Sequence, residues 1–150
     1  MKYTYSLKRG FTLLEVLIVI GIIAVLSAAV LVAVNPTRQF KLARDTQRLA
    51  NVSAIANAIS QNMSEHKGVF TCDYQIANTA EPISSANADI LDCLVPTYIS
   101  ALPIDPSDPN ARYVSATDYN TAYTVSRNAS TSRITVAAVG EIETTIEAVR

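Results

Sequence analysis

The hydrophobic pattern of the chain begins with a long apolar run, from Phe11 to Val34, in which Glu15 is the only charged residue. A helix of this length spans roughly 36 Å at 1.5 Å per residue, enough to cross a bilayer core of about 30 Å. An acidic group at mid-membrane costs about 2.5–3.5 kcal/mol or more. Glu15 therefore indicates a function beyond anchoring, unless it lies hydrated at the membrane interface.

The pair Asn35-Pro36 interrupts this run, because proline lacks a backbone donor and disfavours helix in the residue before it. From 37 to 67 the pattern is helical again, with Lys41 and Asp45, and Asp45 and Arg48, placed to pair on a solvated face. Gly68 is expected to cap the helix. An apolar stripe at spacings of three or four needs a sheet to cover it: Leu49, Val52, Ala56, Ile59 and Met63.

Beyond residue 68 the pattern changes to that of a small sheet domain. Residues 69–100 are irregular, with a short helical turn expected at 89–94, and residues 101–110 contain three prolines and form a rigid loop. Segments rich in Val, Ile, Thr and Tyr follow and predict strands, with Gly140 as the turn before the last one. These segments are 113–116, 122–126, 134–139 and 142–149. The whole pattern predicts an α+β fold, in which a long N-terminal helix, apolar and then amphipathic, packs on a small antiparallel sheet.

Charge and polar chemistry add few candidates to this picture. The chain has 12 basic and 13 acidic residues and a single histidine, His66, which is expected to be solvated. No catalytic constellation is visible, so we predict that the protein is not an enzyme and needs no cofactor. Asp105, Asp108 and Asp118 are candidate calcium ligands, but their spacing is not that of an EF-hand, and turn formation is the favoured role.

The strongest motif is Lys8-Arg9-Gly10-Phe11-Thr12-Leu13-Leu14-Glu15, placed directly before the apolar run. It resembles the amino terminus of type IV prepilins and pseudopilins, in which leader, glycine, phenylalanine and glutamate occur in this register. The resemblance implies cleavage between Gly10 and Phe11 and methylation of the new amine of Phe11. It also implies that Glu15 neutralises the amino terminus of a neighbouring subunit during filament assembly.

The position of this cleavage site differs from that of a secretory signal, whose apolar region precedes the cut. Here cleavage leaves the apolar helix on the mature chain, whereas a simple signal anchor with a chance glycine is the alternative. The positive charges of Lys2, Lys8 and Arg9 place the amino end in the cytoplasm and the head outside. Their loss changes the net charge from −1 to −4, which argues against a broad nucleic-acid-binding surface.

Cys72 and Cys93 are the only cysteines. In an exported head they predict one disulfide, which would close a loop of about 20 residues and stabilise the head by roughly 3 kcal/mol. Two free thiols are the alternative. No metal site is expected, because two cysteines and one histidine do not supply four clustered ligands.

These observations divide the chain into a leader at 1–10, a membrane and filament-core helix at 11–35, an amphipathic helix at 36–68 and a head at 69–150. The resemblance implies a structural subunit of a type IV pilus-like filament, stored in the inner membrane and then assembled outside the cell. Its implied partners are copies of itself, other pilins, a prepilin peptidase, an inner-membrane platform protein and an assembly ATPase acting indirectly. A pseudopilin of a secretion or DNA-uptake machine, and a filament-borne adhesin or DNA-binding minor pilin, remain alternatives.

Overall fold

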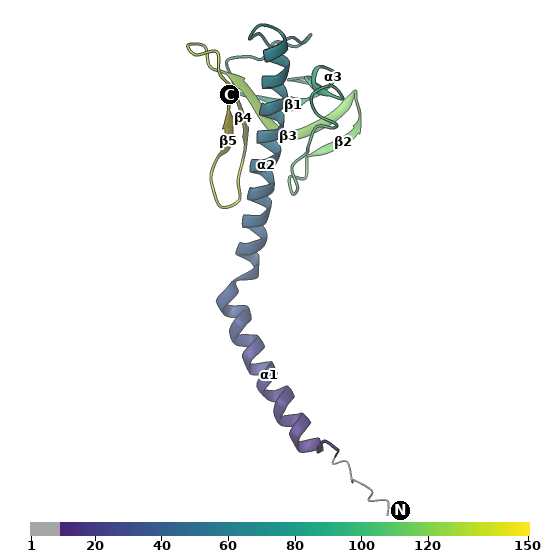
Figure 1. Cartoon of the computed structure of the whole chain (residues 1–150), viewed down its shortest axis with the longest axis vertical. Coiled ribbons are helices and arrows are strands. Elements are labelled where there is room, and N and C mark those ends of the chain that lie inside the picture. The colour runs from purple at the N-terminus through teal and green to yellow at the C-terminus, as the bar shows by residue number, and fades with distance from the viewer. Residues whose placement is uncertain (1–9) are drawn as a thin grey trace, which may run out of the picture. The chain divides into compact units, whose positions relative to one another are not determined.

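The computed structural model describes residues 10–150, so the basic leader residues Lys2, Lys8 and Arg9 lie outside the described range. The chain separates into two compact units, with the division between Gln39 and Phe40. Figure 1 shows the helices and the sheet that make up these units.

The first unit is built around α1 (Leu13–Val34), an uninterrupted helix without a single buried residue. Its large apolar side chains are between about half and four-fifths exposed, on every side of the helix. By length and composition, α1 is the one helix within residues 10–150 that is long and apolar enough to cross a membrane. The apolar helix predicted at 11–35 is therefore present, and nothing within the first unit covers it.

A single residue, Asn35, separates α1 from α2 (Pro36–Glu65). Its backbone is left-handed, with φ 45° and ψ 76°, which ends α1. Its side-chain oxygen then accepts a hydrogen bond from the Arg38 N–H at 3.3 Å, which begins the next helix, and Pro36 occupies the first helical position, where no donor is needed. The predicted interruption at Asn35-Pro36 is confirmed, and it is short.

Helix α2 is amphipathic, as predicted, but its buried face is rotated from the predicted stripe. Val52, Ala56 and Ile59 are buried, whereas Leu49 is 49% exposed. The face continues instead through Arg48 and Asp45, which are 4% and 5% exposed. Leu49 was therefore wrongly assigned to the core, and the placement of Asp45 and Arg48 on a solvated face was also wrong.

The C-terminal end of α2 closes in a Schellman arrangement. The Gly68 N–H donates to the Met63 carbonyl at 2.8 Å, and Lys67 takes the left-handed position with φ 58°. Gly68, at φ 85°, lies one residue beyond that position. Glycine thus contributes to the predicted cap, although a lysine accepts the left-handed conformation.

The sheet of the second unit is antiparallel, with neighbouring strands in the order β1-β3-β4-β5. Strand β2 pairs with the first residues of β3, and β4 pairs with its last residues. The short helix α3 (Leu91–Leu94) lies between β1 and β2 in sequence, within the predicted turn. The strands are β1 (Glu81–Ser84), β2 (Arg112–Ser115), β3 (Asp118–Arg127), β4 (Ile134–Ala138) and β5 (Ile146–Val149).

One face of this sheet and the buried face of α2 form the core. Burial alternates strictly along β3, where Tyr119, Thr121, Tyr123 and Val125 point inward. The same alternation continues in β4 and β5, and Val52, Ile55 and Ile59 of α2 join the same cluster. Figure 1 shows α2 running across the sheet at this place. The α+β class and the packing of the helix on the sheet are confirmed.

Three segments differ from the prediction. Strand β3 is longer than predicted, because residues 118–121 also belong to it. Strand β1 was not anticipated, because Pro82 within it is typical of an edge or an irregular segment, and β1 does lie at an edge of the sheet. The last strand is shorter than predicted, since 142–145 belong to the loop between β4 and β5. Gly140 lies in that loop, where an added Cβ would meet the Glu143 carbonyl oxygen at 2.0 Å.

Candidate processing and assembly site

Residues Gly10, Phe11 and Thr12 precede the first turn of α1 and are exposed, with the Phe11 side chain 83% accessible. A Cβ added at Gly10 would have no neighbour within 4 Å, and the backbone there is not left-handed. The fold itself therefore gives no reason for a glycine at this position. A requirement for glycine has to come from a molecule that approaches the chain.

Thr12 fixes where α1 begins. Its backbone is extended, at φ −83° and ψ 150°, and its hydroxyl accepts a hydrogen bond from the Glu15 N–H at 3.2 Å. This is an N-cap, which satisfies one of the backbone donors that a helix start leaves free. The cap keeps the bond between Gly10 and Phe11 outside the helix.

Glu15 occupies the third position of α1, where its negative charge is favoured by the helix dipole. Together with Phe11, Val16 and Val19 it lines a shallow groove of about 260 Å³. In a full capping box the glutamate side chain would bond back to the N–H of Thr12. Within residues 10–150 the Glu15 carboxylate makes no hydrogen bond or ion pair.

A charged network surrounds Arg48 in the second unit, and the sequence predicted only its pair with Asp45. Its guanidinium donates to both carboxylate oxygens of Asp105, at 2.6 and 2.9 Å, and to Asp45 at 2.8 Å. It also donates to the hydroxyl of Ser107 at 2.7 Å. Each carboxylate side chain is at most 6% exposed, so the guanidinium holds the proline-rich loop against α2 from inside the structure.

The same network holds the loop between β4 and β5. Asp45 accepts hydrogen bonds from the backbone N–H groups of Glu141 and Ile142, both at 2.8 Å. Burial alone would raise the pKa of Asp45, but these donors and the bond from Arg48 outweigh it and lower the pKa to about 2. Arg44 binds both oxygens of the Glu141 carboxylate and lowers its pKa to about 2.

The aspartates considered as calcium ligands do not come together. Asp105 binds Arg48 and accepts backbone N–H bonds from Ser107 and Asp108, both at 2.9 Å. Asp118 pairs with Arg112 at 2.8 Å. Within residues 10–150 no group of three or more candidate ligands could hold a metal ion. The arrangement is that of an Asx turn at Asp105, which agrees with the favoured role in turn formation.

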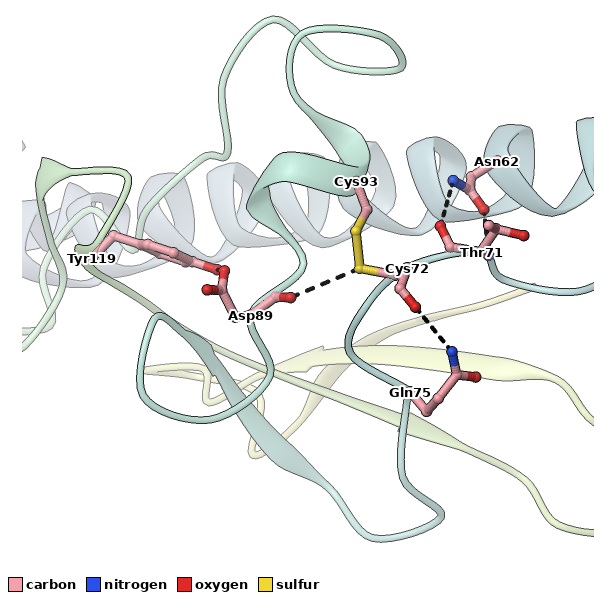
Figure 2. The surroundings of a disulfide bond; sticks show 7 residues. All are labelled: Asn62, Thr71, Cys72, Gln75, Asp89, Cys93 and Tyr119. Atoms are coloured by element: carbon pink, nitrogen blue, oxygen red, sulfur yellow. Dashed lines mark hydrogen bonds between the residues drawn. A yellow bond between two sulfur atoms is a disulfide. The ribbon is translucent and has the colours of Figure 1, made fainter.

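The structure joins Cys72 and Cys93 by a disulfide, with their Cα atoms 5.5 Å apart (Figure 2). The bond connects the segment after α2 to α3. Asn62 of α2 holds the neighbouring Thr71, because its side chain accepts from the Thr71 N–H at 2.9 Å and donates to the Thr71 carbonyl at 3.2 Å. The disulfide loop is therefore attached to the helix at its beginning.

The loop is also attached to the sheet. The Tyr119 hydroxyl, from β3, donates to Asp89 at 2.7 Å, as Figure 2 shows. Burial and this carboxylate raise the pKa of Tyr119, so the hydroxyl keeps its proton and remains a donor. His66 is exposed, as expected from the sequence, and among the described residues its Nδ1 forms a hydrogen bond only with the Asn62 carbonyl.

Comparison with known protein families identifies the extended segment and the start of α1. Residues 5–31 match the family model of the prokaryotic N-terminal methylation motif. The chain carries a prepilin-type methylation motif. This motif is the hallmark of type IV prepilins and pseudopilins, and its match at the start of the chain supports a precursor of that general kind.

The methylation motif covers Gly10, Phe11, Thr12 and Glu15, the residues that form the helix start described above. It marks structural subunits and not an enzyme family, and together with α1 it suits a membrane-anchored precursor. No curated protein and no solved structure matches the chain.

Proposed function

We propose that this protein is the structural subunit of a type IV pilus-like filament, cut after Gly10 by a prepilin peptidase and polymerised through α1. The observation that carries the proposal is the helix start within the methylation motif, where an exposed Gly10-Phe11 bond precedes a capped helix whose Glu15 has no ion-pair partner among residues 10–150. Both features serve molecules other than the folded chain.

The chemistry of assembly follows from two charges in an apolar surrounding. Cleavage after Gly10 creates an ammonium group at Phe11, and Glu15 supplies the opposite charge on the next subunit. When helices bundle, each charge would be buried at a cost of several kcal/mol, and pairing offsets part of that cost. A subunit joins with the best energy only when its Glu15 meets a neighbouring ammonium group.

The exposed surface of α1 supports the same proposal. None of its residues is buried, and its apolar side chains face every direction. Such a helix is stable only in lipid or among other helices. Lipid surrounds it in the precursor, and the α1 helices of other subunits would surround it in the filament.

The head supports export across the membrane. Its disulfide between Cys72 and Cys93 is typical of proteins that fold in an oxidising compartment. The leader charges at Lys2, Lys8 and Arg9 favour an amino end in the cytoplasm. We therefore propose an inner-membrane precursor with its head outside. A peptidase, a platform protein, an assembly ATPase and other pilins are the proposed partners.

A pseudopilin of a secretion or DNA-uptake machine is the second candidate, because the same methylation motif marks pseudopilins. Long filaments on sheared cells favour the pilin, whereas short assemblies that are needed for secretion favour the pseudopilin. The proposals differ in filament length and abundance and not in the chemistry of Glu15.

The test compares filaments from a strain that lacks the chain after complementation with wild type, Glu15→Leu or Glu15→Asp. Glu15→Leu should insert and be cut, since the leader is intact, but filaments should be lost because the Phe11 ammonium has no partner. Glu15→Asp keeps the charge at shorter reach and should give a partial defect. Electron microscopy counts the filaments, and an immunoblot measures the processed subunit.

Glu147→Leu is the matched control, because Glu147 is an exposed carboxylate on β5 outside the methylation motif. It should leave filament number unchanged. Normal filaments from Glu15→Leu subunits alone would contradict the proposed role of Glu15. Absence of any assembly from wild type would contradict the filament function.

A further inference from the structure

The end of the head where α2 finishes contains a small pocket that no part of the proposed function uses. Its volume is about 130 Å³. Buried apolar side chains form its inner part, among them Phe70, Ile76 and Ile134, while Val69 at its border is 61% exposed. A pocket of this kind accepts one apolar side chain and not an extended ligand.

One basic residue lines the pocket, and two more are next to lining residues in sequence. Arg127 lines it directly, Lys67 precedes the lining residue Gly68, and Arg133 follows the lining residue Ser132. All three basic side chains are exposed, and none belongs to an ion pair within the described residues. The pocket therefore fits an apolar side chain that is accompanied by a negative charge.

The loop between β4 and β5 offers that combination. Ile142 is 40% exposed, and the next residue, Glu143, is exposed and free of ion pairs within residues 10–150. The loop backbone is held in place, because Asp45 accepts the N–H groups of Glu141, Ile142 and Glu143, the last at 3.4 Å. An apolar side chain and a carboxylate are thus presented on a rigid support, so little entropy is lost on docking.

The loop cannot fill the pocket of its own chain. Asp45, which holds the loop, and Met63, which lines the pocket, both lie on α2 and are roughly 27 Å apart at 1.5 Å per residue. Both surfaces belong to one compact unit, in which α2 separates them along its length. A contact between different surfaces on two copies is heterologous, and unless it closes into a ring it continues as an open polymer.

We propose that Ile142 of one head enters the pocket beside Phe70 and Ile134 of the next copy, with Glu143 against Arg127. The proposal rests on the proposed filament function and adds to it a head-to-tail contact between subunits. Burial of the isoleucine side chain supplies the attraction, and the opposite charges set its direction. The contact repeats along the filament because each copy carries both surfaces.

Oxidative cross-linking of assembled filaments tests the contact. A full-length Glu143→Cys/Val69→Cys double variant should form a ladder of covalent multimers, because every subunit links to the next at both ends. Each single variant should stay monomeric. Glu143→Cys/Ala116→Cys is the matched control, since Ala116 is exposed in the turn between β2 and β3, away from the pocket, and should give no ladder.

Charge reversal provides a second measurement. Arg127→Glu and Glu143→Arg should each lower filament number by about fivefold, and the double variant should recover most of the loss because the charges again oppose. Val139→Ser should have no effect, whereas Ile142→Ser should weaken assembly, although both side chains are exposed in the same loop region.

The outcomes separate this contact from the filament function on which it rests. Normal filaments without a ladder, or charge reversals without effect, would overturn the contact and leave the filament function intact. A disulfide between Val69→Cys and a different protein would assign the pocket to that protein and also overturn the proposal. Wild-type cells without any assembly would overturn both.

Discussion

The two units of the chain are stabilised in opposite ways. Helix α1 is apolar except for Glu15 and Ser27 and has no buried residue, whereas α2 buries one face on the sheet and pairs its buried charged residues internally. Within residues 10–150, no buried side-chain nitrogen or oxygen lacks a hydrogen-bond partner. The second unit is therefore complete as a single chain, whereas α1 depends on lipid or on other helices.

The charged residues of the two units differ in the same way. Arg48 and its carboxylate partners are paired inside one copy, and their role is to hold the head together. Glu15 has no partner within the described residues, and its proposed role requires another copy. The carboxylates that contact Arg48 therefore stabilise a single copy of the chain, whereas the proposed partner of Glu15 is a cation on another copy.

The largest expected effect on the head comes from Arg48→Met. It leaves Asp45 and Asp105 buried without their cation and should lower the free energy of unfolding by about 3–5 kcal/mol. Urea unfolding of the full chain in detergent, followed by tyrosine near-ultraviolet circular dichroism, measures this. Arg112→Met is the control, because its ion pair with Asp118 is exposed and should change stability by less than about 1 kcal/mol. Equal effects of the two substitutions would contradict a buried network.

Loss of the disulfide should have the next largest effect. Cys72→Ser/Cys93→Ser releases a link across a sequence separation of 21 and should destabilise the head by roughly 3 kcal/mol in the loop-entropy model. The helicity of α1 should not change, because the bond lies wholly in the second unit. A change in the helicity of α1, with no change in the stability of the head, would contradict this assignment of the disulfide to the second unit.

Acid should weaken the head before it affects α1. The pKa values of Asp45 and Glu141 are lowered to about 2 in the fold, from ordinary values of 3.8 and 4.5. A lowered folded-state pKa means that stability is fully present above the unfolded-state value and is lost as pH falls toward 2; Asp45 alone contributes about 2 kcal/mol. Urea midpoints measured from pH 6 to pH 2 should fall below about pH 4.5. Asp45→Asn should flatten part of that fall.

The smallest expected effect concerns the helix start. Thr12→Ala removes the N-cap and should cost about 1 kcal/mol locally, while Thr12→Ser should cost little. Amide hydrogen exchange of the full chain in detergent should therefore become faster at Glu15 in Thr12→Ala alone. Unchanged exchange at Glu15 would mean that the hydroxyl does not cap α1. Head stability serves as the internal control and should not move.

Local patterns in the sequence were sufficient for the helices, for β4 and the second half of β3, and for the interruption at Asn35-Pro36. They failed where distant residues decide the structure. The sequence predicted that Leu49 is buried and that its neighbour Arg48 is exposed, and the structure shows the reverse. Arg48 is buried because Asp105 binds it from a loop 57 positions away in sequence. No periodicity in α2 contains that information.

The loop between β4 and β5 shows the same limit. Residues 142–145 alternate as a strand would, yet the backbone N–H groups of Ile142 and Glu143 bind Asp45, and the segment lies outside the sheet. The helix start was predictable because its signal is local: Thr12 and Glu15 lie three positions apart, and the methylation motif covers both. The pocket beside Phe70 was not predictable, because α2, β3 and β4 meet there only in the fold.

The most direct test of the account is the mass of the mature chain. Mass spectrometry of protein isolated from cells should show an amino terminus at Phe11, carrying one added methyl group, with the Cys72–Cys93 bond intact. Gly10→Val should leave the precursor uncut in the membrane and serves as the control for the peptidase. A mature chain that still contains Lys8, or one that begins after Ala29, would contradict processing at Gly10 and with it the proposed prepilin function.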